Sequence, residues 1–120
     1  MTTIPDPILH VALADDLARA HESGRYRCAS LESEGFVHCC DPGQLAGVVA
    51  RYYKGVDDLV LLDIDPHALD VELVRESAVE DGERFPHVYG SIPLEAVRRT
   101  RAFGLDDPAR IALAGGDTER

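Results

Sequence analysis

The sequence predicts an α+β fold, and three observations lead to this prediction. A helix-start signal at Asp41 precedes apolar residues at helical spacing, whereas Ile8–Leu13 and Leu59–Ile64 are apolar runs of strand length. No repeat or low-complexity block interrupts the 120 residues, a length that suits one domain. We therefore expect the whole chain to form a single domain, with a core over residues 8–103 and a short C-terminal helix or tail over residues 104–120.

Two helices are expected from their end signals. Residues 14–22 should form the first, which ends at Gly24 because glycine readily adopts the left-handed conformation at a helix end. The second should begin with Asp41 as N-cap, Pro42 at the first position and Gln44 in the capping box. Its apolar stripe is expected to consist of Leu45, Val48, Val49 and Tyr52, with Gly55 closing the helix.

The remaining apolar runs are expected to be strands. They are Ile8–Leu13, residues 25–31, residues 36–40, Leu59–Ile64, residues 71–75 and Val97–Phe103. Leu59–Ile64 is apolar on both faces, which is typical of a central strand. Within residues 36–40, the two-residue period of a strand places Phe36, His38 and Cys40 on one face. Residues 85–90, bounded by proline and glycine, are expected to form a stiff aromatic turn.

Charge and composition narrow the class of partner. The formal net charge is −10, which disfavours extended nucleic acid because such binding needs Lys and Arg at the phosphates. No stretch reaches the ~20 apolar residues of a membrane helix, and the N-terminus lacks the basic and apolar regions of a signal peptide. We therefore expect a cytoplasmic protein without a membrane partner, whose three cysteines stay reduced. The oligomeric state is left open.

Several common catalytic patterns are missing from the sequence. It has no Gly-rich dinucleotide fingerprint, no phosphate loop and no nucleophile elbow. A metal site at His38 and Cys40 would need further ligands from elsewhere in the chain, so we expect none. Cys40, just before the helix start at Asp41, could be a thiolate nucleophile. A small, buried, unreactive cysteine is the favoured interpretation.

His10 and His38 carry the strongest indication of a site, because each interrupts an otherwise apolar strand. Burying an imidazole is unfavourable unless the ring finds a hydrogen bond or faces a cleft. Taken singly, each residue could equally be a satisfied core histidine. Taken together, and with His87 and Tyr89 close by in the sequence motif of residues 85–90, they favour a shared cleft.

Four parts of the chain resemble one small bacterial family. They are residues 30–39 (SLESEGFVHC), Gln44, residues 61–65 (LLDID) and residues 85–90 (FPHVYG). In that order they are similar to the domain-of-unknown-function family nine-five-two, and the resemblance runs over residues 8–103. It implies an ADP-ribosyltransferase-like fold with split, mostly antiparallel sheets and peripheral helices, closest to the RNA 2′-phosphotransferase branch.

The same resemblance implies roles for individual residues. In such folds the first-strand histidine, here His10, contacts the adenosine-side ribose of NAD, and the next one, here His38, lies by the nicotinamide ribose. Glu76 is a loose match to the glutamate that orients this second ribose. Arg25 and Arg27 lie in the region of the phosphate-binding arginines, without a clear match to them.

The expected function is therefore that of a small protein with an NAD- or nucleotide-binding cleft. NAD is the expected cofactor, transfer of ADP-ribose or phosphate is the candidate activity, and His38 and His10 are the candidate catalytic residues. The expected ligand contacts are Arg27, Ser30, Gln44, Glu76, His87 and Tyr89. The alternative is a non-catalytic ligand-binding or protein-interaction module on the same scaffold, since fold alone does not establish activity. A third alternative, an accessory protein for a nucleotide-linked or acyl substrate, rests on the pocket alone.

Overall fold

The computed structural model describes residues 7–53, 58–77 and 82–103. Within them the chain forms an α+β fold whose paired strands all run antiparallel. This confirms the predicted fold class and the predicted strand direction. Among the described residues, no helix has both the length and the apolar character that crossing a membrane requires.

The first sheet consists of β1 (Ile8–Leu13), β4 (Leu59–Ile64) and β8 (Val97–Phe103), in the order β1-β4-β8. The three predicted strands are confirmed, and β4 is central, as its two apolar faces indicated. Helix α1 (Ala14–Ser23) follows β1 directly. It ends at Gly24, whose φ of 89° is left-handed and whose N–H bonds to the carbonyl of Ala20.

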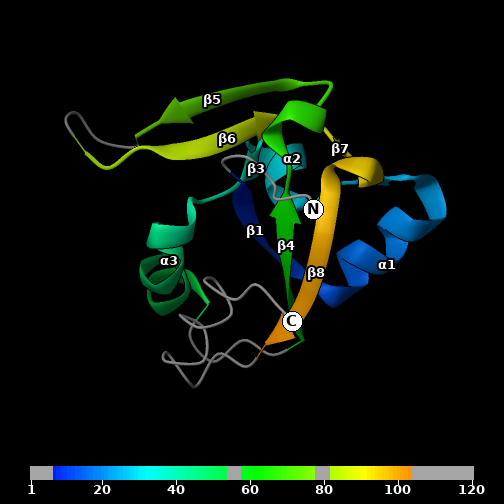
Figure 1. Cartoon of the computed structure of the whole chain (residues 1–120), viewed down its shortest axis with the longest axis horizontal. Helices are drawn as coiled ribbons and strands as arrows, with labels where there is room; N and C mark the ends of the chain where they lie inside the picture. The colour runs from blue at the N-terminus through cyan, green and yellow to red at the C-terminus, as the bar shows by residue number, and fades with distance from the viewer. Residues whose placement is uncertain (1–6, 54–57, 78–81, 104–120) are drawn as a thin grey trace, which may run out of the picture.

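The second sheet has the order β3-β6-β5. Its strands are β3 (Val37–His38), β6 (Phe85–Tyr89) and β5 (Glu72–Glu76), and β2 (Arg25–Tyr26) pairs separately with β7 (Ile92–Pro93). In Figure 1, β5 and β6 lie across one end of the first sheet, and α1 and α3 (Leu45–Tyr52) lie at opposite sides of it. The remaining elements are α2 (Ala29–Ser33) and the 3₁₀ turns Pro42–Gln44, Pro66–Ala68 and Leu94–Ala96.

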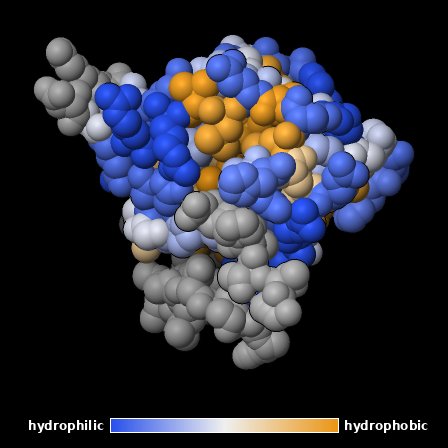
Figure 2. All heavy atoms as spheres, turned by 45° about the horizontal axis from the view of Figure 1, so that its top comes forward, coloured by the Kyte–Doolittle hydropathy of each residue, from blue (hydrophilic) through white to orange (hydrophobic). Residues whose placement is uncertain are grey.

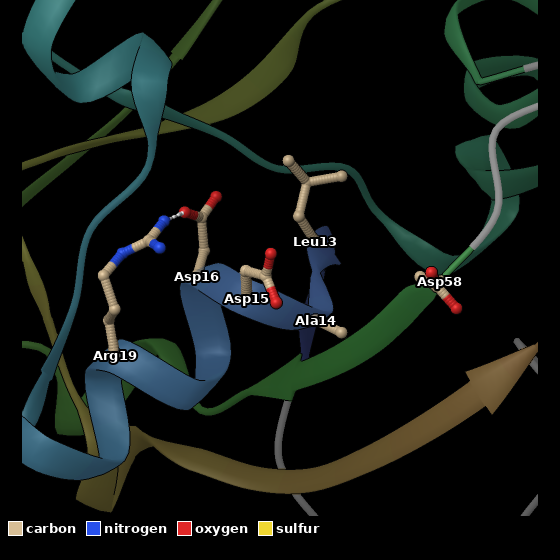
Figure 3. Close-up of a pocket in the computed structure, with 6 residues that line it drawn as sticks. All are labelled: Leu13, Ala14, Asp15, Asp16, Arg19 and Asp58. Atoms are coloured by element: carbon tan, nitrogen blue, oxygen red, sulfur yellow. Dashed lines mark hydrogen bonds and ion pairs between the residues drawn. The ribbon is translucent and has the colours of Figure 1, made fainter.

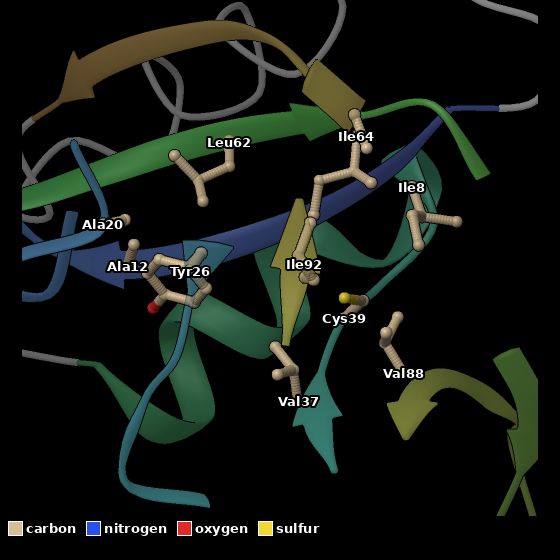
Figure 4. Close-up of a cluster of buried hydrophobic side chains, with 11 residues drawn as sticks. Ile8, Ala12, Ala20, Tyr26, Val37, Cys39, Leu62, Ile64, Val88 and Ile92 are labelled. Carbon is tan, nitrogen blue, oxygen red and sulfur yellow. The ribbon is translucent and has the colours of Figure 1, made fainter. Parts of the chain in front are cut away.

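The β1-β4-β8 sheet separates two hydrophobic clusters, because alternate residues of a strand point to opposite faces. Ile8 and Ala12 contribute to the cluster on the side of the second sheet, and Leu9 and Val11 to the cluster on the side of α3. Figure 4 shows the first cluster, where side chains of β1 and β4 meet those of α1 and of the short strands β2, β3, β6 and β7. Its members include Tyr26, Val37, Cys39, Leu62, Ile64, Val88 and Ile92.

The expectation of an extended segment over residues 25–31 is wrong beyond β2. The short helix α2 occupies Ala29–Ser33, and the left-handed Gly35, with φ of 92°, then turns the chain into β3. A helix of five residues is too short to show helical periodicity in the sequence. Its effect on the site is direct, because it sets where the chain enters β3.

The expectation of a stiff turn over residues 85–90 is also wrong, since β6 is the middle strand of its sheet. Proline argues against a central strand because it lacks an N–H. Pro86 nevertheless serves as an acceptor, taking a hydrogen bond of 3.0 Å from the N–H of Cys39. The residue after β6, Gly90, has to be a glycine for a steric reason, because a Cβ there would lie 2.6 Å from Cγ1 of Val71.

Two smaller corrections concern the side of a helix or strand on which a residue lies. Tyr52 is 67% exposed and does not extend the apolar stripe of α3, because the helix ends there and the non-helical Tyr53 packs on the core instead. Cys40 does not share the face of His38, because β3 ends at His38 and Cys40 pairs with Leu9 in the α3-side cluster. The predicted helix end at Gly55 and the C-terminal segment of residues 104–120 lie outside the described residues.

Candidate functional site

The site is built on one pair of residues, His38 in β3 and His87 in β6, which lie directly opposite each other in the antiparallel register. Their ring centroids are 5.1 Å apart, with the planes at 77°. The His38 side chain is half exposed, and its Nε2 lies 3.1 Å from Oε2 of Glu34. The His87 ring is mostly covered. His38 is therefore the imidazole that solvent and a ligand can reach.

Phe36 joins the rings of this surface. Its ring stacks on His87 at 4.1 Å and 16°, and lies 4.8 Å from His38 and 5.2 Å from Tyr89. The strand period places Phe36 on the face of His38. Ser30 supports it from α2, donating a hydrogen bond of 2.7 Å from Oγ to the carbonyl of Phe36.

Glu76, the last residue of β5, links two side chains of β6 by hydrogen bonds. Its Oε1 accepts hydrogen bonds from Nδ1 of His87 at 2.8 Å and from the hydroxyl of Tyr89 at 2.6 Å. These two donors, the tyrosine first, lower the pKa of Glu76, and the carboxylate in turn raises the pKa of Tyr89. Because an ionised carboxylate only accepts, Nδ1 of His87 carries the proton. We call Phe36, His38, Glu76, His87 and Tyr89 the histidine surface.

His10 lies beneath this surface rather than in it. The residue is 4% exposed, its Nδ1 lies 2.6 Å from the carbonyl oxygen of His38, and its Nε2 lies 2.7 Å from the hydroxyl of Tyr26. Burial is the largest cause that lowers its pKa to about 4. Both ring nitrogens are engaged, so the expected shared cleft of the two imidazoles is not what the structure contains: they are linked through the backbone of His38.

Three other expected ligand contacts have partners of their own. Arg27 pairs with Glu32 at 2.8 Å, and Ser30 supports the loop as described. Gln44 links the start of its own helical segment, at Asp41, to the residues just before β6. Its Oε1 accepts from the N–H of Asp41 at 2.8 Å, and its Nε2 donates to Oε2 of Glu83 at 3.0 Å and to the carbonyl of Arg84 at 2.9 Å. Gln44 therefore combines its predicted helix-start role with anchoring of the chain that enters β6.

Three residues that were not expected at the site also matter here, namely Glu34, Phe36 and Tyr26. The signal for Phe36 was present, since it shares the strand face of His38. Glu34 and Tyr26 gave no such signal, because α2 and the long-range contact of Tyr26 with His10 arise only in the fold.

The buried cysteines do not have the lowered pKa of a thiolate nucleophile. Burial raises the pKa of Cys39 well above its usual value and that of Cys40 to about 12, which fits the interpretation as small buried residues. Within residues 7–53, 58–77 and 82–103, no group of His, Cys, Asp and Glu side chains is arranged to hold a metal ion.

A separate hollow of about 270 Å³ lies at the start of α1 (Figure 3). Arg19 already pairs there with Asp16. The lining residues are Leu13, Ala14, Asp15, Asp16, Arg19 and Asp58. None of them belongs to the histidine surface.

Fold and site together define an α+β protein with antiparallel sheets that presents paired histidines and a carboxylate on the outer face of its second sheet. The chain belongs to the family described as "Protein of unknown function (DUF952)", whose model matches residues 11–100. This confirms the family suggested by the sequence motifs.

Two solved structures show the same fold. The crystal structure of protein CC0527 from Caulobacter crescentus is 28% identical, with a TM-score of 0.70, over 78% of this chain and 82% of that one. The solution structure of the same protein is 25% identical, with a TM-score of 0.69, over 95% of this chain and 98% of that one. No curated protein matches the chain.

Proposed function

We propose that this protein binds NAD or a related adenine nucleotide at the histidine surface, on a scaffold of the ADP-ribosyltransferase type close to the RNA 2′-phosphotransferase branch. One observation supports this most: Glu76, the loose match to the ribose-orienting glutamate, lies beside His87 and Tyr89 in the same surface as His38. We further propose that the protein works in the cytoplasm.

The chemistry of the surface suits a nucleoside. Carboxylates commonly bind ribose hydroxyls, as in dinucleotide-binding folds, and Glu76 is a carboxylate with its second oxygen available to such a group. Aromatic faces such as Tyr89, which is 37% exposed, stack on bases. The net charge of −10 favours a mononucleotide or dinucleotide over extended nucleic acid.

His38 is the candidate acid–base group for transfer. In that reaction the bond between ribose C1′ and the nicotinamide nitrogen breaks, and a bond forms between C1′ and an acceptor oxygen. The proton of the acceptor hydroxyl then passes to the imidazole of His38, since histidine is the side chain that most often serves as general base. Free nicotinamide leaves as the neutral base. His10 has no contact role in this proposal, because its ring is buried behind His38.

The second candidate is a non-catalytic ligand-binding or protein-interaction module. Figure 2, which turns the end of the molecule with β5 and β6 toward the viewer, shows apolar side chains gathered in one patch ringed by hydrophilic ones. Contiguous exposed apolar patches mark protein interaction sites or ligand-binding grooves. The pairing of Arg27 with Glu32 also favours this candidate, because it engages an arginine in the region where the resemblance implies phosphate-binding arginines.

Calorimetric titration with NAD, ADP-ribose and AMP tests the proposal, with chromatography of free nicotinamide in parallel. We expect binding in the wild-type protein and its loss in His38→Ala and Glu76→Gln. His67→Ala is the matched control, since His67 lies in the Pro66–Ala68 turn. No binding at millimolar nucleotide would overturn the proposal, and binding that both surface variants retain would place the ligand elsewhere. Binding without nicotinamide release would favour the non-catalytic module.

A further inference from the structure

The buried ring of His10 can exist in one tautomer only. Its Nδ1 lies 2.6 Å from the carbonyl oxygen of His38, and a carbonyl oxygen can only accept. Nδ1 therefore carries the proton. Nε2 is left with its lone pair, so it accepts the hydrogen bond of 2.7 Å from the hydroxyl of Tyr26. The result is a directed chain from Tyr26 through His10 to the backbone of His38.

The carbonyl of His38 is turned toward this chain by the sheet itself. Cys39 N–H donates to Pro86 at 3.0 Å. Because hydrogen-bonded and non-hydrogen-bonded pairs alternate in an antiparallel ladder, the neighbouring pair of His38 and His87 is a non-hydrogen-bonded one. In such a pair the carbonyl points away from the partner strand and the side chains lie close. The first property presents the His38 carbonyl to His10, and the second brings the two imidazoles together.

Strand β3 depends on these contacts because it is only two residues long. Leu9 and Cys40 exchange backbone hydrogen bonds of 2.7 and 2.8 Å just beyond it. The contact of His10 with His38 is the next link between β1 and this segment. Burial lowers the pKa of His10 to about 4, so the ring stays neutral, and the tautomer is kept, at neutral pH.

We infer that His10 is a positioning residue for His38: its Nδ1–H, oriented by Tyr26, fixes the peptide that carries the exposed imidazole of the histidine surface. The inference rests on the proposed site at His38 but not on the identity of the ligand. It replaces the direct ribose contact that the family resemblance implied for His10 with a role through the backbone of its neighbour.

Two conservative variants of His10 test its two hydrogen bonds separately, the one to the His38 carbonyl and the one to the Tyr26 hydroxyl. In His10→Asn the amide nitrogen takes the place of Nδ1 and can still donate to the His38 carbonyl. In His10→Gln the amide reaches the place of Nε2, so the contact with Tyr26 can form but the donor to His38 is lost. Tyr26→Phe keeps the imidazole and removes only the hydroxyl that donates to its Nε2.

The readout is the NMR spectrum of the imidazoles, together with nucleotide affinity. We expect long-range ¹H–¹⁵N correlations to show the Nδ1–H tautomer of His10 in the wild-type protein. The ring signals of His38 should stay in place in His10→Asn and shift in His10→Gln. Nucleotide affinity should fall about tenfold in His10→Gln alone, the loss that corresponds to about one hydrogen bond.

An Nε2–H tautomer of His10, or the same His38 ring shifts in both variants, would overturn the inference. The tautomer is measured on the wild-type protein, so the test stands even if a variant does not fold. The NMR test is also valid if no nucleotide binds. Absence of binding would overturn the proposed function, whereas the spectra alone would decide whether His10 positions His38.

Discussion

His38 and His87 face each other across β3 and β6 with ring centroids 5.1 Å apart, yet each ring is held by a different carboxylate. His38 lies by Glu34, from the turn after α2, and His87 donates to Glu76, from β5. The exposed imidazole is thus attached to a local turn, whereas the covered one is attached to the neighbouring strand. This difference makes His38 the group that meets a ligand and His87 part of the frame that holds Glu76.

The hydrogen bond between Tyr89 and Glu76 leads to a prediction about ionisation. The carboxylate stabilises the neutral phenol, which raises the pKa of Tyr89. Glu76→Gln removes the charge and should lower the pKa of Tyr89 toward its ordinary value of 10.0. Ultraviolet titration of tyrosinate measures this, with Tyr89→Phe to assign the signal. Glu72→Gln is the matched control, since Glu72 lies opposite Tyr89 but contributes the smaller effect. Equal shifts in both variants would contradict the assigned hydrogen bond.

The burial of His10 leads to a prediction about acid stability. Its pKa is about 4 in the folded protein and 6.5 in an unfolded chain, so between these values the unfolded chain binds more protons. Stability should therefore be complete above pH 6.5 and fall by about 3 kcal/mol as the pH drops to 4. Urea unfolding across this range measures the loss.

His10→Asn provides the comparison for this acid effect, because it has no titrating ring. The variant should be less stable at neutral pH, since Tyr26 loses its acceptor. Its free energy of unfolding should nevertheless vary less between pH 6.5 and 4 than that of the wild type. Parallel curves for the two proteins would show that other groups cause the acid loss.

The first sheet could be predicted because its strands carry their own signals. Leu59–Ile64 and Val97–Phe103 agree with β4 and β8, and the start of α1 follows Leu13 as expected. The second sheet could be predicted only in part. Its short strand β3 and the proline in β6 give weak local patterns, and pairing with distant segments decides their conformation.

The candidate site, too, could be predicted from the sequence only in part. His38, Glu76, His87 and Tyr89 were all expected, and the structure brings them together on one sheet face. His10 was expected there too, but a polar residue in an apolar strand can face either a cleft or a buried partner. Its partner, the hydroxyl of Tyr26, lies 16 residues away in the sequence, so periodicity could not reveal it. What the surface binds stays a prediction.

The cysteines should differ sharply in reactivity. Cys39 and Cys40 are buried, and their raised pKa values keep both thiols protonated at pH 8, whereas Cys28 is half-buried. A disulfide reagent should react quickly with one thiol of the native protein and with all three cysteines after unfolding. Cys28→Ser should abolish the fast phase. A fast phase that survives this change would show that Cys40 or Cys39 is accessible and would reopen the question of a thiol nucleophile.

The buried ion pairs of Asp63 in β4 with Arg99 and Arg101 in β8 should contribute more to stability than the exposed ion pairs. Asp63 is 4% exposed and accepts from Arg101 at 2.7 and 2.8 Å and from Arg99 at 3.1 Å. Two nitrogens of Arg101, Nε and Nη1, are buried without a hydrogen-bond partner among the described residues, so its charge relies on this carboxylate. Asp63→Asn should therefore cost about 3 kcal/mol or more, the usual result of breaking a buried pair.

Asp70→Asn is the matched control for Asp63, because it removes one carboxylate from an exposed pair with Arg25. Exposed pairs contribute little to stability, since water and salt screen them, so Asp70→Asn should cost much less than Asp63→Asn. Urea midpoints of the two variants at pH 7 give the comparison. A similar loss in both would mean that the buried cluster is compensated by groups beyond Asp63, Arg99 and Arg101, and that burial does not set its contribution.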